Sequence, residues 1–106
     1  MKAYSLLENL EFHDKNPYAE PLLVNENSRI LRFTLRPGQE VREHDAPHSP
    51  VHIIVLKGTG KIAGPDGIEQ EYGPNELLTF EPGEKHTARA LDEDFVFIAF
   101  LHEAPR

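Results

Sequence analysis

The sequence of 106 residues contains no cysteine and no tryptophan. Without cysteine there is no disulfide framework, no thiolate zinc site and no cysteine nucleophile. The sequence also lacks an apolar run near the ~20 residues that a membrane-spanning helix needs. Glu8 interrupts the N-terminal segment too early for the apolar core of a signal peptide. We therefore predict a cytoplasmic protein that has no membrane partner.

Positive charge is scarce as well. Lys and Arg total 11 against 18 Asp and Glu, which gives a formal net charge of −7. General nucleic-acid binding needs a basic face that displaces counterions, so we expect no nucleic-acid partner. The one local excess of positive charge consists of Arg29, Arg32, Arg36 and Arg42. We interpret it as a solvated surface, with a pocket for an anionic ligand as the alternative.

Helical periodicity is limited to the first residues, where the capping-box spacing of Ser5 and Glu8 predicts one short helix that ends before Pro17. From residue 29 onward, short apolar segments alternate with turns that contain Pro and Gly. Residues 51–56, apolar except for His52, predict a strand buried on both faces. The other expected strands span residues 30–36, 61–63, 68–72, 77–80, 86–91 and 95–101. This spacing predicts an all-β sandwich or barrel.

One pattern occurs twice in the chain: a strand, then Pro-Gly, then Glu, then His. It runs from Leu35 through Pro37-Gly38 to His44, and again from Thr79 through Pro82-Gly83 to His86. The first Pro-Gly pair predicts a type II turn. Two equivalent halves of a jelly roll would produce such a repeat.

Histidines are the residues most suited to chemistry. His44, His48 and His52 lie within nine residues, and His86 follows the second Pro-Gly turn. Neutral imidazole is a common ligand of zinc, iron, copper and nickel. A short segment plus one distant residue is the usual ligand supply of a mononuclear site. These four histidines are therefore the candidate metal ligands.

The same residues carry a resemblance to a known family. Gly38, five further residues and His44, followed by a buried strand that ends at Val55-Leu56-Lys57-Gly58, resemble the first motif of the cupins. Apolar residues 77–80, Pro82-Gly83 and His86 resemble the second motif. The resemblance covers about residues 29–101 and identifies the chain as a small single-domain cupin.

The resemblance implies a double-stranded β-helix, that is, a jelly-roll barrel, with a short N-terminal extension. We expect residues 1–28 to form an extension that packs on the barrel and residues 29–106 to form the barrel domain. The resemblance also implies a homodimer, and exposed sheet edges that need covering make a dimer physically reasonable.

The sequence departs from the metal site of the family. Ala46 stands where the second histidine would be, and Val51 stands where the glutamate would be. His44 and His86 keep their positions and rank first among the ligand candidates. His48, between two prolines, ranks next. His52 ranks last, because it points away from the lumen if its neighbour Val51 points into it.

Two kinds of function follow as hypotheses. The first is a β-barrel that binds a small molecule in its lumen, with a divalent transition metal (zinc, iron, manganese, nickel or copper) as an optional cofactor and no organic cofactor. The alternative is a metal-dependent oxygenase or isomerase acting on a small polar substrate, although the missing carboxylate counts against a two-histidine, one-carboxylate iron centre. A metal-free pocket in which His44 and His86 bond a ligand, and a purely structural barrel dimer, stay open.

Overall fold

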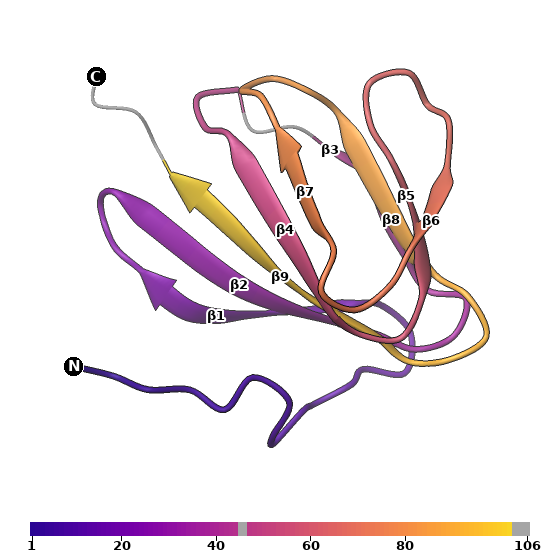
Figure 1. Cartoon of the computed structure of the whole chain (residues 1–106). Helices are drawn as coiled ribbons and strands as arrows, with labels where there is room; N and C mark the ends of the chain where they lie inside the picture. Colours follow the sequence, from indigo (N-terminus) through magenta and orange to yellow (C-terminus); the bar gives the residue numbers. More distant parts are fainter. Residues whose placement is uncertain (45–46, 103–106) are drawn as a thin grey trace.

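The computed structural model describes residues 1–44 and 47–102, without the side chains of residues 43 and 44. All regular structure in these residues is β-strand, arranged in two antiparallel sheets that face each other (Figure 1). One sheet has the strand order β1-β2-β9-β4-β7 and the other the order β3-β8-β5-β6. The strands are β1 Tyr18–Val24, β2 Ser28–Leu35, β3 Glu40–His44, β4 Val51–Lys57, β5 Gly60–Ala63, β6 Gln70–Tyr72, β7 Leu77–Phe80, β8 His86–Ala90 and β9 Phe95–His102. The prediction of an all-β barrel is confirmed.

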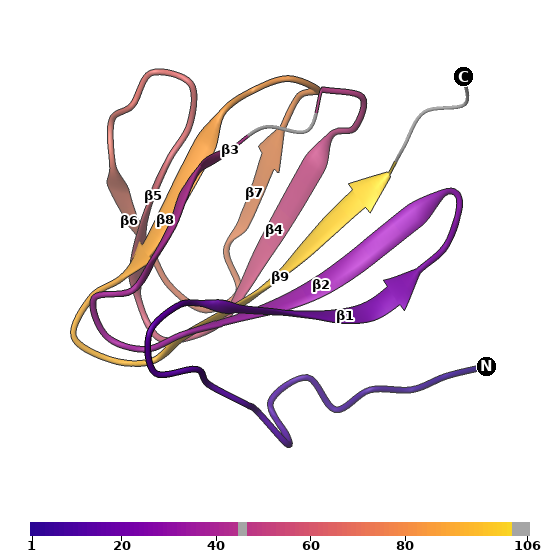
Figure 2. The same ribbon diagram turned by 180° about the vertical axis from the view of Figure 1, so that it is seen from behind.

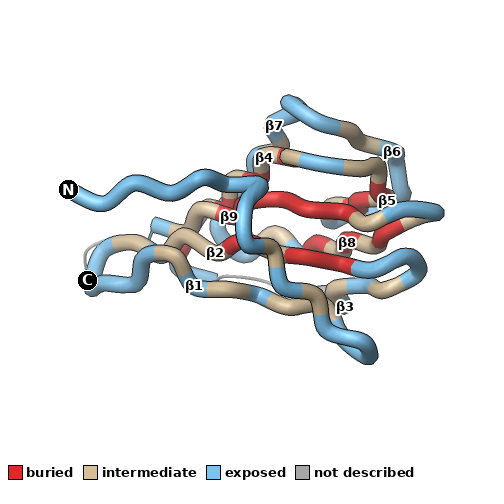
Figure 3. Tube along the Cα trace, turned by 90° about the horizontal axis from the view of Figure 1, so that it is seen from below, coloured by how far each residue is buried: buried red, intermediate tan, exposed pale blue. Residues whose placement is uncertain are grey.

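The core lies between the two sheets, where alternate side chains of each strand meet. In β4 the residues Val51, Ile53 and Val55 are buried, whereas the residues between them are only partly covered. The expectation that this strand is buried on both faces is therefore wrong for its outer face. Burial is greatest at one end of the barrel, where Leu35 and Phe95 are fully enclosed (Figure 3). This closed end anchors both sheets and leaves the other end free to hold a cavity.

Two Pro-Gly turns carry the chain from one sheet to the other. Pro37-Gly38 connects β2 to β3, and Pro82-Gly83 connects β7 to β8. In each turn the residue after the glycine donates its backbone N–H to the residue before the proline, at 3.0 and 3.1 Å. Both glycines have a positive φ, of 81° and 85°, as a type II turn requires. The repeated sequence pattern thus corresponds to two equivalent crossings between the sheets.

The connection from β4 to β5 depends on glycine for a different reason. Gly58 has a φ of +76°, and a Cβ built there would collide with the backbone carbonyl oxygen of Asp94. A Cβ at Gly60 would collide with the ring of Phe95. These two glycines let the chain turn tightly against the start of β9 and so complete the closed end of the barrel.

The N-terminal segment lies outside the five-stranded sheet, against β2 (Figure 2). The expected helix at its start is wrong, because residues 6–9 form turns and bends. The buried guanidinium of Arg32 donates to the backbone carbonyls of Leu6 and Glu8, and the hydroxyl of Thr34 donates to that of Glu11. A helix this short is marginal by itself, and bonding to β2 replaces its internal hydrogen bonds. Within the part of the chain that the structure describes, no helix has the length and apolarity to cross a membrane.

Strand β1 lies inside the predicted N-terminal extension and pairs with β2 at the edge of the sheet. From the sequence, strands are expected only from residue 29 onward, so β1 adds to the predicted set. Pro21 is tolerated in β1 because this strand lies at the edge of the sheet. The register shifts between Pro21 and Leu23, so the irregularity is confined to one place. The division of the chain into an extension of residues 1–28 and a barrel of residues 29–106 stays a prediction.

Candidate functional site

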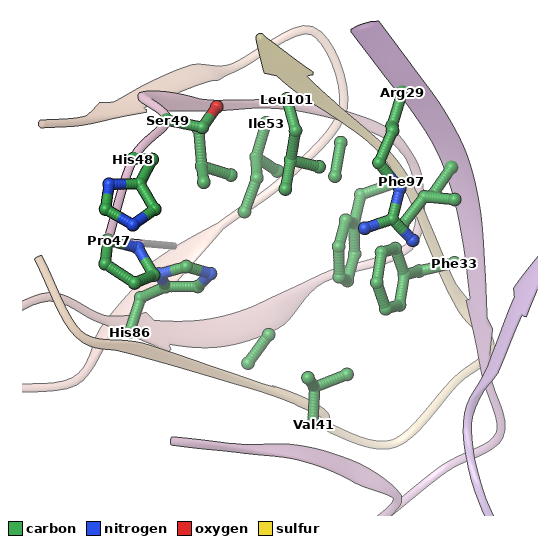
Figure 4. Close-up of a pocket in the computed structure, with 14 residues that line it drawn as sticks. Arg29, Phe33, Val41, Pro47, His48, Ser49, Ile53, His86, Phe97 and Leu101 are labelled. Atoms are coloured by element: carbon green, nitrogen blue, oxygen red, sulfur yellow. The ribbon is translucent and has the colours of Figure 1, made fainter. Parts of the chain in front are cut away.

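A cavity of about 380 Å³ opens between the sheets at the end of the barrel opposite the closed end (Figure 4). The starts of β4 and β8 and the end of β9 surround it. Ten of its fourteen lining residues are apolar and come from both sheets. The polar lining residues are Arg29, His48, Ser49 and His86. Among the histidine candidates whose side chains are described, His48 and His86 therefore line one cavity.

His86 is the best-fixed polar group of this lining. It is the first residue of β8, directly after the second Pro-Gly turn, and only 4% of it is exposed. Its ring stacks on Phe80, with 4.6 Å between centroids and an interplanar angle of 21°. Nδ1 lies 3.4 Å from the carbonyl oxygen of Glu84. Since a carbonyl can only accept, a hydrogen bond at this contact requires the proton on Nδ1.

His48 is exposed and lies on the loop before β4, on the same side of the cavity as His86 (Figure 4). The neighbouring Ser49 fixes this loop. Its buried hydroxyl accepts a hydrogen bond from the backbone N–H of His102, at 2.7 Å, and donates to the carbonyl of Pro50. The loop that carries His48 is therefore tied to the end of β9, whereas the imidazole itself stays accessible to a ligand.

The backbone of His44 pairs with that of His86 across β3 and β8. The two motifs of the sequence therefore meet at adjacent strands, as the candidate site requires. The side chain of His44 lies outside the described residues, as does Ala46. What the imidazole of His44 contacts therefore stays a prediction.

His52 does not line the cavity. Its neighbours Val51 and Ile53 face the cavity, so His52 points to the outer face of the five-stranded sheet. Its Nδ1 is buried and has no hydrogen-bond partner among the described residues. A lumenal metal ion is therefore out of reach of His52 in this arrangement.

The described donors fall short of a complete metal site. Val51, which stands where the family has a glutamate, is 4% exposed and lines the cavity as an apolar residue. Within residues 1–44 and 47–102, apart from the side chains left out above, no group of three His, Cys, Asp or Glu is placed to hold a metal ion. Among the side chains that the structure describes, no carboxylate lines the cavity. The polar groups of the described lining are two imidazoles, one guanidinium and one hydroxyl.

Arg29 also lines the cavity, whereas the sequence favours a solvated surface for the arginine group and gives a pocket for an anionic ligand as the alternative. The alternation of β2 contained the signal, because Arg29 has the same parity as the inward-facing Leu31 and Phe33. Arg32, of the opposite parity, is buried under the N-terminal segment and pairs with Glu20 at 2.6 Å. The arginines that are close in sequence therefore have different structural roles.

Comparisons with known proteins agree with this architecture. The chain is similar to an uncharacterized conserved protein with a double-stranded β-helix domain from Klebsiella pneumoniae, with 22% identity, a TM-score of 0.89, and coverage of 97% of this chain and 90% of that chain. It is similar to an RmlC-like cupin protein from Desulfovibrio desulfuricans, with 26% identity, a TM-score of 0.88 and coverage of 96% of each chain. A protein from Thermus thermophilus, 17% identical, has a TM-score of 0.90 over 99% of this chain and 100% of that chain.

Comparison with curated proteins finds no match. The family model described as the cupin domain matches residues 31–101, which contain both Pro-Gly turns and the two paired histidines. The match covers most of the barrel and more than half of the chain. The chain therefore belongs to the cupin family.

Proposed function

We propose that the barrel binds a small, largely apolar molecule in its cavity. The observation that carries this proposal is the cavity itself, about 380 Å³ in volume, open at one end and lined mostly by apolar side chains. Small-molecule sites typically have volumes of about 300–1,000 Å³ and combine apolar walls with a few polar groups. The imidazoles of His48 and His86 and the guanidinium of Arg29 supply such polar groups.

Small residues create the space. Ala88 on β8 and Ala99 on β9 are both buried and line the cavity from opposite sheets. A side chain the size of leucine at either position would occupy volume that a ligand needs. The stacked rings of Phe33 and Phe97, with centroids 4.8 Å apart, add an aromatic wall. An apolar ring or a branched chain would pack well against these surfaces.

The test is a titration of isotope-labelled protein with neutral alcohols and amides, benzyl alcohol and cyclohexanol among them, monitored by NMR. We expect shift changes at backbone amides around the cavity, and their loss in Ala88→Leu and Ala99→Leu. Thr87→Leu is the matched control, because Thr87 lies next to Ala88 but is not part of the cavity lining. Shift changes that persist in both filled variants, or none in the wild-type protein, would refute the proposal. Thermal unfolding of each variant checks that the fold is retained.

Metal binding is the second candidate, and the backbone pairing of His44 with His86 favours it. We propose His44, His48 and His86 as the ligands of one divalent transition metal; we drop His52, which faces away from the cavity. When bound, such an ion would polarise a ligand oxygen. The oxygenase or isomerase activity raised by the sequence depends on this metal.

Elemental analysis of the untagged protein separates the two candidates. About one metal ion per chain in the wild-type protein, lost in His86→Ala and retained in His13→Ala, would establish the metal site. His13 is an appropriate control because it is exposed, stacks on Tyr18 and lies outside the cavity lining. Absence of metal after incubation with zinc, iron, manganese, nickel and copper would reject this candidate and leave the metal-free pocket.

A homodimer and a cytoplasmic location complete the proposal. The edges of the two sheets are β1, β7, β3 and β6, and Leu77 at the start of β7 is 62% exposed. Unpaired edge strands are commonly covered in native proteins, and pairing with a second copy is one way to cover them.

A further inference from the structure

We infer that the cavity selects an organic acid, with one carboxylate bound to Arg29 and an apolar body packed in the barrel. This inference rests on the proposed function, because it names the class of molecule that the cavity takes. It makes Arg29 the residue that determines specificity, whereas the apolar walls determine the size and shape of the ligand.

The position of Arg29 is the first argument. Arg29 lies at the start of β2 and pairs with Leu101 of β9, which in turn pairs with Val51 of β4. Arg29 therefore lies two strands, or about 10 Å, from Val51 along the mouth of the cavity. Figure 4 shows its guanidinium turned inward beside Phe33, across the cavity from His48 and His86. Although the residue is exposed, its charged group borders the space that a ligand would fill.

The second argument is that Arg29 has no counter-ion among the residues that the structure describes. Arg32 pairs with Glu20, Arg36 lies 3.6 Å from Asp14, and Arg89 pairs with Glu69. Arg29, in contrast, forms no ion pair and no side-chain hydrogen bond with any residue that the structure describes. A guanidinium carries several donors in a fixed planar arrangement and is well satisfied by a carboxylate.

The charge of the lining contrasts with that of the whole chain. The chain has a net charge of −7, yet the described lining of the cavity contains Arg29, His48 and His86 and no Asp or Glu. The apolar walls focus the positive potential of the Arg29 guanidinium into the space where the ligand would bind. The apolar walls also lower the local dielectric, which strengthens a charge-assisted hydrogen bond. A neutral ligand could form hydrogen bonds in this cavity but would gain no ionic contact with Arg29.

The arrangement favours one carboxylate over a phosphate. A single guanidinium matches one carboxylate through two parallel hydrogen bonds. A doubly charged phosphate would leave charge uncompensated, because the described part of the lining contains no lysine and no second arginine. The imidazoles on the other side of the cavity suit a hydroxyl or carbonyl at the far end of the ligand. The structure thus points to an acid with an aromatic or branched body and a second polar atom.

The test compares 4-hydroxybenzoate with 4-hydroxybenzamide, which have the same shape but differ in charge at neutral pH. Dissociation constants are measured by calorimetry or NMR for the wild-type protein, Arg29→Met and Arg36→Met. We expect the wild-type protein to bind the acid about tenfold or more tightly than the amide. Arg29→Met should remove this preference. Arg36→Met should keep it, because Arg36 is exposed and is not part of the cavity lining.

The remaining outcomes separate this inference from the proposed function. Equal binding of acid and amide would overturn the acid preference but leave small-molecule binding intact. A preference that survives in Arg29→Met would also overturn the inference, because another group would then hold the anion. If neither compound binds, the inference fails, and the titration with neutral fragments decides the proposed function independently. A preference that weakens at high salt would support an ionic contact.

Discussion

Arg32 is a charged side chain held in a buried position, and its removal tests how the N-terminal segment is attached. Its side chain is 6% exposed, and its guanidinium donates hydrogen bonds to Glu20 and to two backbone carbonyls of the N-terminal segment. We predict that Arg32→Met lowers the free energy of unfolding by about 2 kcal/mol, because the carboxylate and both carbonyls lose their donor. Urea denaturation measures the change.

The double variant Arg32→Met with Glu20→Gln is the control for this prediction. It removes both charges, so it leaves no unpaired carboxylate against the sheet, and we expect it to be more stable than Arg32→Met alone. A double variant that is less stable by the sum of the two single effects would show that the pair itself contributes little.

Glu69 and Arg89 give the protein a defined pH dependence. The hydrogen bond from Arg89, 2.8 Å from Nε to Oε2, holds the pKa of the Glu69 carboxyl below its ordinary value. A lowered pKa in the folded state means that the pair stabilises the fold above the ordinary glutamate pKa of about 4.3. This contribution is lost as the pH falls through the lowered pKa. We predict that Glu69→Gln is less stable than the wild-type protein at neutral pH and that the difference shrinks at acidic pH.

Thermal unfolding at a series of pH values measures this convergence. Glu71→Gln is the matched control, because it removes a nearby negative charge and leaves the Arg89–Glu69 pair in place. A difference between Glu69→Gln and wild type that is constant across the whole pH range would contradict the prediction.

At the same scale, the sequence predicts part of the candidate site. The order and spacing of residues in the second motif were enough to select His86. A histidine that follows a strand and a Pro-Gly turn can be recognised from neighbouring residues alone. Arg29 is not among the predicted site residues, because four arginines close in sequence favour one solvated surface over a pocket for an anionic ligand, although the alternation of β2 separates Arg29 from Arg32. The sequence also does not show that Ser49 binds the backbone of His102, since this contact joins residues 53 positions apart.

At the scale of the element, the turn between β4 and β5 depends on the backbone conformation and surroundings of Gly58. Gly58 and Gly67 have nearly the same positive φ, +76° and +74°. Of the two, only at Gly58 would an added Cβ collide with backbone atoms of Asp94 and Phe95. We predict that Gly67→Ala costs roughly 1–2 kcal/mol of stability, the strain of a left-handed alanine. Gly58→Ala should cost about 3 kcal/mol or more, because it adds a backbone collision.

Chemical denaturation of the two variants measures the difference between them. Both alanines have the backbone strain of a positive φ. The additional loss of unfolding free energy in Gly58→Ala therefore measures the collision of its Cβ with the start of β9. Equal stability of the two variants would mean that β9 moves aside at little cost.

Strand prediction succeeded where an element has one continuous pattern. The predicted segments 77–80 and 95–101 correspond closely to β7 and β9. Strand β1 was missed because Pro21 interrupts it, and its stability comes from pairing with β2 and not from its own sequence. The N-terminal helix was predicted on local spacing alone, and the donors of Arg32 and Thr34 on β2 outweigh that preference.

At the scale of the whole molecule, we predict a homodimer. Four edge strands, including β7 with its exposed Leu77, have no second neighbour within the described chain. Sedimentation equilibrium should give twice the mass of the chain, and Leu77→Lys should shift the equilibrium toward the monomer if β7 forms the contact. A wild-type protein that sediments as a monomer at all concentrations would reject the prediction.

One end of the barrel contains the residues that stabilise the fold, and the other end contains the residues that would contact a ligand. Fully enclosed side chains such as Leu35 and Phe95 gather at the closed end, whereas Arg29 and His48 lie exposed around the opposite opening. Substitution of these exposed residues removes little buried apolar surface. It can therefore change the ligand preference with little loss of folding stability. Related chains can therefore diverge in ligand through a handful of changes at strand ends, and shared ancestry preserves the barrel more faithfully than its chemistry.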